Sequence, residues 1–191
     1  YWNIDDYGTA HNVLSASVRA GNVIGGGDWS KDRLIPDIMK ATAAGEKTLI
    51  RNPVSIRPWQ HVLECLSGYL MLGEKLLDGN TSFASAFNFG PADTDAVEVG
   101  AIAEMVQRHW PKAEFTMPAS AAGPHEARYL KLDCSRARSM LHWEPVWHVE
   151  QAIERTVNWY RRFYEQGEAC SAEDLEAFVG DARDKGLLWT T

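Results

Sequence analysis

The sequence is poor in cysteine and contains no long apolar run. Its 191 residues include three cysteines, Cys65, Cys134 and Cys170. Because their number is odd and their spacing is far from Cys-x-x-Cys, neither a disulfide framework nor a zinc site is indicated. No apolar run reaches the roughly 18 residues that a membrane-spanning helix needs, and the first residues, YWNIDDYGTAHN, lack the basic and apolar regions of a signal peptide. We therefore expect reduced, buried thiols in a cytoplasmic protein that does not contact membranes.

The sequence also lacks an excess of positive charge. It has 26 acidic and 19 basic residues, which gives a formal net charge of -7 at pH 7. A general nucleic-acid-binding surface is therefore not expected, although a local cluster of arginines could still hold phosphate groups.

The glycine motifs of nucleotide-binding loops are missing as well. Neither Gly-x-x-x-x-Gly-Lys-Ser/Thr nor Gly-x-Gly-x-x-Gly occurs. The most glycine-rich stretch, RAGNVIGGGDW, continues into Asp28 and Trp29 rather than into a helix, and an acidic residue there would repel a phosphate. Two explanations remain open for the glycines at 25–27: a conformationally demanding turn, or close approach of a ligand to the backbone.

Motifs for metal binding and for hydrolysis are absent too. The six histidines show no His-x-x-x-His or His-Glu-x-x-His spacing, so no metal site is predicted. No serine lies in a Gly-x-Ser-x-Gly context, so a hydrolase nucleophile is not predicted either.

The sequence does contain regular alternation of strand and helix patterns. Short apolar runs predict strands at residues 14–20, 48–51, 86–89 and 114–117. Apolar residues at helical spacing predict helices at 33–44, 60–77, 97–110 and 149–164, followed by a polar helix at 172–185. Residues 21–31 are predicted to form a loop, with Asp32 as the N-cap of the next helix. This order of elements predicts the α/β class, with strands so few and short that they need neighbours to complete a buried sheet.

Three arginines lie in short extended or loop segments rather than on helices. These are Arg19, Arg57 and Arg128. Each alone is typical of a surface ion pair, but arginine also offers a planar fork that holds a diphosphate bidentately. Together the three indicate a pocket for an anion, and we expect Trp29 and Trp59 to lie near its ligand.

Several longer segments carry a resemblance to a known family. They are SVRAGNVIGGGDW, KDRLIPDI, RNPVSIRPWQHVLE, FNFGP and PHEARYLKLDCS, in this order. They resemble the C-terminal half of the CDP-glucose 4,6-dehydratases, which are NAD-dependent enzymes of the extended short-chain dehydrogenase/reductase type. The resemblance covers roughly residues 7–159. The segments RPWQH and PHEA distinguish the CDP-glucose branch from the looser pattern of other sugar-nucleotide epimerases and dehydratases.

The resemblance implies a fold and a reaction. It implies the C-terminal part of a Rossmann-type enzyme, with the end of the NAD-binding domain at residues 1–30. A mainly sugar-nucleotide-binding domain would follow at 31–170 and a helical extension at 171–191. The family oxidises the sugar of CDP-glucose at C4 with NAD, eliminates water across C5 and C6, and returns the hydride to C6. The product, CDP-4-keto-6-deoxyglucose, is a precursor of dideoxysugars in lipopolysaccharide.

The resemblance also implies site residues. At the nicotinamide end of NAD it places Ala20, Asn22 and Val23. For the substrate it implies contacts from Asn22, Arg33, Leu34, Ile35, Arg57, Trp59 and Arg128. Within these, Asn22, Arg57 and Arg128 match positions that hold the diphosphate, and Arg33 to Ile35 match the segment along the nucleobase and ribose.

The chain departs from the family in one large respect. None of its six tyrosines is followed by lysine four residues later, so the Tyr-x-x-x-Lys pair of the family is absent, as is its Rossmann glycine turn. We therefore expect that the catalytic half lies before Tyr1, that no catalytic residue lies in this chain, and that the chain alone is inactive. Homo-oligomers are expected of the full-length enzyme. Two alternatives stay open: an enzyme for another nucleotide sugar, with UDP or GDP as carrier, and a non-catalytic module that binds nucleotide sugars.

Overall fold

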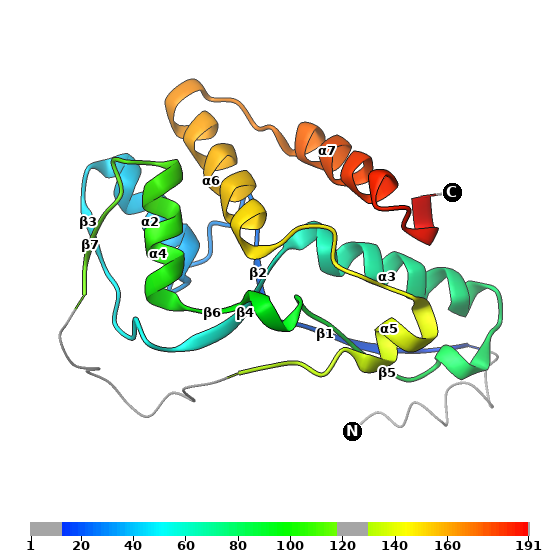
Figure 1. Cartoon of the computed structure of the whole chain (residues 1–191). Coiled ribbons are helices and arrows are strands. Elements are labelled where there is room, and N and C mark those ends of the chain that lie inside the picture. Colours follow the sequence, from blue (N-terminus) through cyan, green and yellow to red (C-terminus); the bar gives the residue numbers. More distant parts are fainter. Residues whose placement is uncertain (1–12, 118–129, 191) are drawn as a thin grey trace.

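The computed structural model describes residues 13–117 and 130–190. Within these ranges the chain forms a mixed α/β fold with three small sheets (Figure 1). The strands are β1 Ser17–Ala20, β2 Asn22–Ile24, β3 Lys47–Leu49, β4 Ile56–His61, β5 Ala86–Phe89, β6 Ala96–Glu98 and β7 Glu114–Thr116. The helices are α2 Leu34–Ala44, α3 Val62–Leu77, α4 Val99–His109, α5 Ser135–Leu141, α6 Val149–Gln166 and α7 Ser171–Asp184. Three short 3₁₀ turns lie at η1 Thr81–Phe83, η2 Asp93–Asp95 and η3 Leu188–Thr190.

The sheets are largely parallel. Strand β1 pairs with β5, β2 pairs with β4, and β3 pairs with β7, all in parallel, while β6 runs antiparallel to β4. Parallel neighbours need a crossover between them, and the helices supply these connections. The predicted α/β class is therefore confirmed.

The loop predicted at residues 21–31 is partly wrong, because Asn22–Ile24 forms β2. Three residues carry too little pattern to identify a strand, and β2 exists because β4 runs beside it. Gly21 makes this approach possible, since a Cβ on it would lie 2.6 Å from the carbonyl oxygen of Pro58. The predicted cap is also wrong: the N-cap of α2 is Arg33, and Asp32 adopts a left-handed backbone with φ of 60°.

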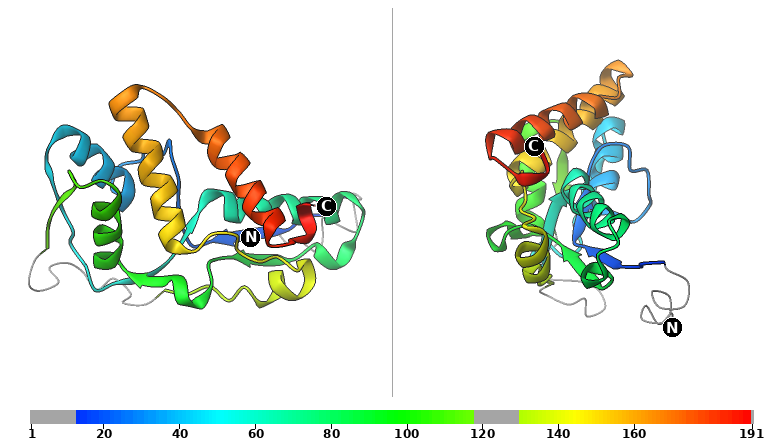
Figure 2. Two further views of the ribbon diagram at one scale, coloured as in Figure 1. Left: turned by 45° about the horizontal axis from the view of Figure 1, so that its top comes forward. Right: turned by 90° about the vertical axis from the view of Figure 1, so that its right-hand side faces the viewer.

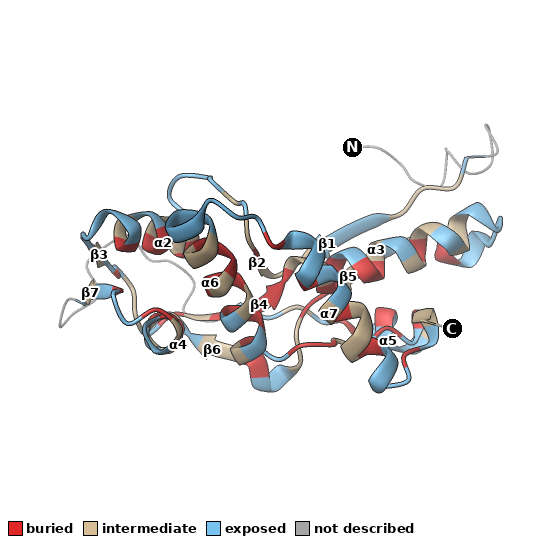
Figure 3. Cartoon of the chain, turned by 90° about the horizontal axis from the view of Figure 1, so that it is seen from above, coloured by how far each residue is buried: buried red, intermediate tan, exposed pale blue. Residues whose placement is uncertain are grey.

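The core consists of three clusters, whose buried residues follow the inner faces of the elements (Figure 3). The first joins α2, α4 and α6 around Trp59 and Tyr160. In the second, α3 and α5 cover Phe87 and Phe89 of β5. The third attaches α7 to the segment that precedes α6, beside the start of α3 (Figure 2). Cys65, Cys134 and Cys170 are free and buried, as expected. Within the described ranges no helix is long and apolar enough to cross a membrane.

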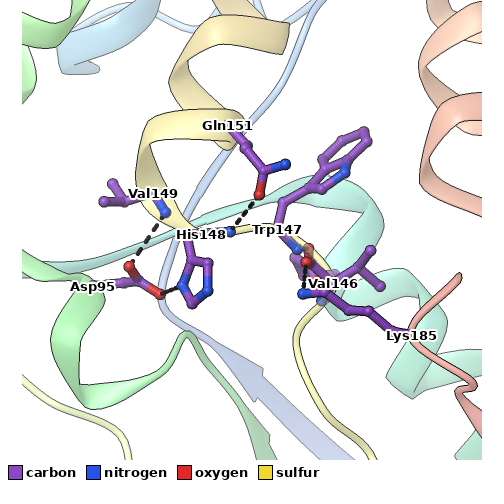
Figure 4. A network of polar contacts seen from close by, with 8 residues as sticks. Asp95, Val146, Trp147, His148, Val149, Gln151 and Lys185 are labelled. Atoms are coloured by element: carbon purple, nitrogen blue, oxygen red, sulfur yellow. Dashed lines mark hydrogen bonds and ion pairs between the residues drawn. The ribbon is translucent and has the colours of Figure 1, made fainter. Parts of the chain in front are cut away.

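A buried carboxylate connects α3 to the segment before α6. Glu64 is fully buried, and its two oxygens accept hydrogen bonds from the backbone N–H groups of Val146 (2.8 Å) and Trp147 (2.7 Å). The same segment is held by Lys185, which donates to the carbonyl of Val146, and by Asp95, 3.1 Å from His148 Nδ1 (Figure 4). These contacts position the end of β4 relative to α6.

Glu64 is expected to make stability depend on pH. Burial raises its pKa to about 7, against the lowering effect of the two backbone N–H bonds. A carboxyl whose pKa is raised on folding stabilises the protein below its unfolded pKa, and this contribution is lost as pH rises to about 7. Relative to Glu64→Gln, the wild type should lose about 2 to 3 kcal/mol of unfolding free energy between about pH 5 and pH 8.

Urea unfolding of both proteins at the two pH values tests this expectation. The comparison with the variant is needed because burial lowers the pKa of His61 to about 4, and this residue changes stability with pH in the opposite sense. Glu74→Gln, on an exposed part of the same helix, is the matched control and should leave the pH profile of the wild type unchanged. Parallel profiles for the wild type and Glu64→Gln would contradict the assignment.

Candidate functional site

A cavity of about 790 Å³ opens where β2, β4 and the start of α2 meet. Pockets of about 300–1,000 Å³ are typical of sites for small molecules and cofactors. Four stretches of chain line this cavity: residues 21–25, residues 32–37, residues 49–52, and the part of β4 that carries Arg57 and Trp59. Asp28, Ser55 and Val99 complete the lining, so a single site is assembled from residues up to 78 positions apart (Gly21 to Val99).

One side of the cavity consists of hydrogen-bond donors from paired strands. Asn22 of β2 lies in register with Trp59 of β4, and Arg57 lies two residues before Trp59, so the three side chains project from the same face of the sheet. Arg57 is 9% exposed and donates to the carbonyl of Ile56 at 2.9 Å. Trp59 is 4% exposed, and its Nε1 has no hydrogen-bond partner among the described residues.

The glycine stretch is explained by packing. A Cβ on Gly26 would lie 2.1 Å from the ring of Trp159, and one on Gly25 would lie 2.8 Å from the side chain of Val62. Gly27 has a φ of 80°, in the left-handed region that favours glycine. Gly27 thus fits the conformationally demanding turn, and Gly25 and Gly26 are explained by close packing; approach of a ligand to Gly25, which lines the cavity, stays a prediction.

The segment after the glycines is anchored on α6. The hydroxyl of Tyr160 accepts from the backbone N–H of Asp28 at 3.0 Å and donates to the carbonyl of Asp28 at 2.6 Å. Burial raises the pKa of Tyr160 to about 12, so the hydroxyl keeps its proton. Trp29, expected near the ligand, instead packs its ring on α6, 5.1 Å from that of Phe163, and does not line the cavity.

An ion pair closes part of the cavity wall. Arg33 Nη1 lies 2.9 Å from Asp28 Oδ2, and the backbone N–H of Ser30 donates to Asp28 Oδ1 at 3.0 Å. Partial burial opposes ionisation of Asp28, but the hydrogen bonds from Ser30 and Arg33 outweigh it and lower the pKa. Part of the positive charge of Arg33 is therefore already compensated before a ligand binds.

Most of the predicted site residues meet around this cavity. Its lining includes Asn22, Val23, Arg33, Leu34, Ile35, Arg57 and Trp59. Their roles toward a ligand stay predictions. Ala20 is absent from the lining, because it belongs to β1 and packs against the second core cluster with Phe87. Arg19 is exposed on β1, and Arg128 lies outside the described residues.

Four charged residues of the lining were not singled out from the sequence as ligand-binding: Asp28, Asp32, Asp37 and Arg51. Arg51 follows a short strand and precedes Asn-Pro, a position where polar residues at strand ends gather, and this signal could have identified it. Asp32 was expected only as a helix cap, and no sequence pattern singled out Asp37. Among the described residues no group of three metal-ligating side chains occurs.

Comparison with curated proteins gives one clear relative. The CDP-glucose 4,6-dehydratase of Salmonella typhimurium is 45% identical over 172 residues, which cover 88% of this chain. The resemblance to the CDP-glucose 4,6-dehydratases is confirmed. The chain spans about half of this relative, 48% of its length. No protein-family model matches the chain.

Solved structures of other sugar-nucleotide enzymes share the fold. The UDP-glucuronic acid 4-epimerase of Bacillus cereus, solved with UDP-glucuronic acid and NAD, superposes with a TM-score of 0.69 at 16% identity. It matches 84% of this chain and 49% of its own. The dTDP-glucose 4,6-dehydratase of Bacillus anthracis, solved with NAD, gives a TM-score of 0.64 at 19% identity, with 84% and 48% covered. The chain therefore has the fold of about half of an extended short-chain dehydrogenase/reductase.

Proposed function

We propose that this chain supplies the sugar-nucleotide-binding half of an NAD-dependent CDP-glucose 4,6-dehydratase. The observation that carries the proposal is the cavity, in which the matched residues Asn22, Arg57 and Trp59 line one face of the sheet. A nucleoside diphosphate sugar carries about two negative charges, and a guanidinium beside a side-chain amide suits them. The 45% identity with the Salmonella enzyme supports CDP-glucose as the substrate.

In the proposed function this chain binds and orients the substrate. NAD, bound mainly by a Rossmann half, supplies the oxidation at C4 and the return of the hydride to C6. Arg57 and Asn22 hold the diphosphate, with Arg128 as their predicted partner. Fixing the diphosphate limits the positions open to the hexose, and orientation of this kind contributes much of the rate of hydride transfer. Val23, beside Asn22 on β2, lines the cavity where the nicotinamide end is predicted.

The proposal is tested by titrating this chain with CDP-glucose, UDP-glucose and GDP-glucose and following its thermal unfolding. At equal concentration, a ligand that binds only the folded state raises the melting temperature more the more tightly it binds, so CDP-glucose should give the largest shift. Equal shifts from all three carriers would overturn the substrate. Incubation of the chain with NAD and CDP-glucose should yield no product, because the base that takes the proton during oxidation at C4 is predicted outside this chain; turnover would contradict that division of roles.

A further inference from the structure

The cavity has two chemically different sides. Asn22 and Arg57 lie on the side that the sheet forms. Around the start of α2 the lining carries Asp28, Asp32 and Asp37 together with Arg33 and Arg51. Arg33 is already paired with Asp28, and Arg51 acts on Asp37, whereas Asp32 keeps an uncompensated negative charge, so a phosphate is favoured beside Arg57 and a neutral, donor-bearing part of the ligand beside Asp32.

Asp32 carries a carboxylate that has no structural role in the turn before α2. Its backbone lies in the left-handed region with φ of 60°, which is uncommon for residues other than glycine. It does not cap α2, whose N-cap is Arg33. Its carboxylate makes no hydrogen bond or ion pair with the residues that the structure describes, whereas Asp28 is occupied by Arg33 and Ser30. An unusual backbone that holds a free acceptor at a cavity wall is a reason to look for a ligand contact.

The surroundings of Asp32 suit a flat ring. Leu34 of α2 and Leu49 of β3 both line the cavity, and the two elements pack together. Leu49 is 57% exposed, which leaves apolar surface in the same cavity that the carboxylates line. A nucleobase fits this combination, because it has an apolar face and polar edges.

We propose that Asp32 selects cytosine by accepting a hydrogen bond from its exocyclic amine. The inference rests on the proposed function and names the determinant of its carrier nucleotide. Cytosine presents an N4 amine where uracil presents a carbonyl oxygen, and carboxylates accept from that amine. The same carboxylate repels the carbonyl of uracil, so one residue both favours CDP and disfavours UDP.

Isothermal titration of the chain with CDP and with UDP tests the assignment. The wild type should bind CDP at least about 10-fold more tightly than UDP, as one good base contact provides. In Asp32→Asn the preference should fall to within about 3-fold, because an amide can turn either its donor or its acceptor to the base. Asparagine tolerates the left-handed backbone, so the fold should be kept, as circular dichroism would verify. Glu46→Gln, an exposed carboxylate just after α2 and outside the cavity lining, is the matched control and should keep the preference for CDP.

The outcomes separate this inference from the proposed function. If neither nucleotide binds the wild type, the nucleotide cavity itself is wrong. If both bind and Asp32→Asn keeps the wild-type ratio of CDP to UDP affinity, the nucleotide cavity is supported and the proposed role of Asp32 is wrong. Titration with 2′-deoxy-CDP tests whether Asp32 instead contacts the ribose. In that case Asp32→Asn would weaken the binding of CDP and UDP equally and would leave the affinity for 2′-deoxy-CDP unchanged. This result would overturn the proposal.

Discussion

Replacing Arg57 by alanine is expected to weaken the binding of CDP by about 100-fold or more. Arg57 is 9% exposed on β4 and shares a face with Trp59, on the side of the cavity that the sheet lines. Charge-assisted hydrogen bonds to phosphate oxygens are roughly twice as strong as neutral ones, and they are strengthened where water is excluded. Removing the guanidinium therefore removes the largest single attraction that this chain is predicted to exert on a diphosphate.

Two further variants make the Arg57 result specific. Arg57→Lys keeps the charge but loses the fork, and it should weaken binding by about 10-fold. Arg19→Ala removes an arginine that the sequence had suggested for the same pocket but that lies exposed on β1, outside the cavity. The Arg19→Ala variant should bind CDP with the affinity of the wild type. Isothermal titration measures all three, with melting temperatures to verify folding; equal losses from Arg19→Ala and Arg57→Ala would show that general charge, rather than this cavity, attracts the nucleotide.

Gly26→Ala is expected to lower the free energy of unfolding by about 3 kcal/mol, near the upper end for overpacked cores. The added Cβ would lie 2.1 Å from the ring of Trp159, and that ring has little freedom, since its Nε1 donates to Ser171 at 2.9 Å. Either α6 or the glycine segment must shift. In a chain of this size the melting temperature should fall by about 6–12 °C. Because residues 21–25 line the cavity, the affinity for CDP should fall as well.

Gly73→Ala is the matched control for this substitution. Gly73 lies inside α3, and a Cβ on it would meet nothing within 4 Å. Alanine is the better helix former by roughly 0.5–1 kcal/mol, so this variant should be slightly more stable than the wild type. Thermal and urea unfolding of both variants provide the comparison. An unchanged melting temperature for Gly26→Ala would mean that the contact with Trp159 does not shape the glycine stretch.

Predictions from the sequence succeeded where the pattern is local and long. The helices at α3 and α6 follow apolar residues at helical spacing, and their observed bounds differ from the predicted ones by only a few residues. The strand at 86–89 was predicted with its observed ends, because Gly90-Pro91 stops it. Strand β2 was missed because three residues are too few to show an alternating pattern. Asp32 was wrongly predicted as a cap because aspartate is a common capping residue, while its left-handed backbone cannot be read from the sequence.

The cavity was predictable only in part, and the resemblance to known enzymes supplied most of it. Arg57, Asn22 and Trp59 lie in motifs that matched, and the structure places them on one face of paired strands. Asp37 matches no pattern that separates a cavity wall from an ordinary surface, and Arg51 shows only the general signal of a polar residue after a strand end. Their position follows from how α2 and the segment after β3 pack together, which no single stretch of sequence encodes.

The sequence by itself determined the class of the fold, the places of the long helices and the similarity to sugar-nucleotide dehydratases. These follow from periodic burial and from motifs within short stretches, because the residues that set each pattern lie only a few positions apart in the sequence. Only the tertiary structure decided why residues 25–27 are glycines, which arginine faces a cavity, and which carboxylate is left without a partner. Each of these depends on contacts such as that of Gly26 with Trp159, between residues far apart along the chain, and such contacts leave no periodic trace in the sequence.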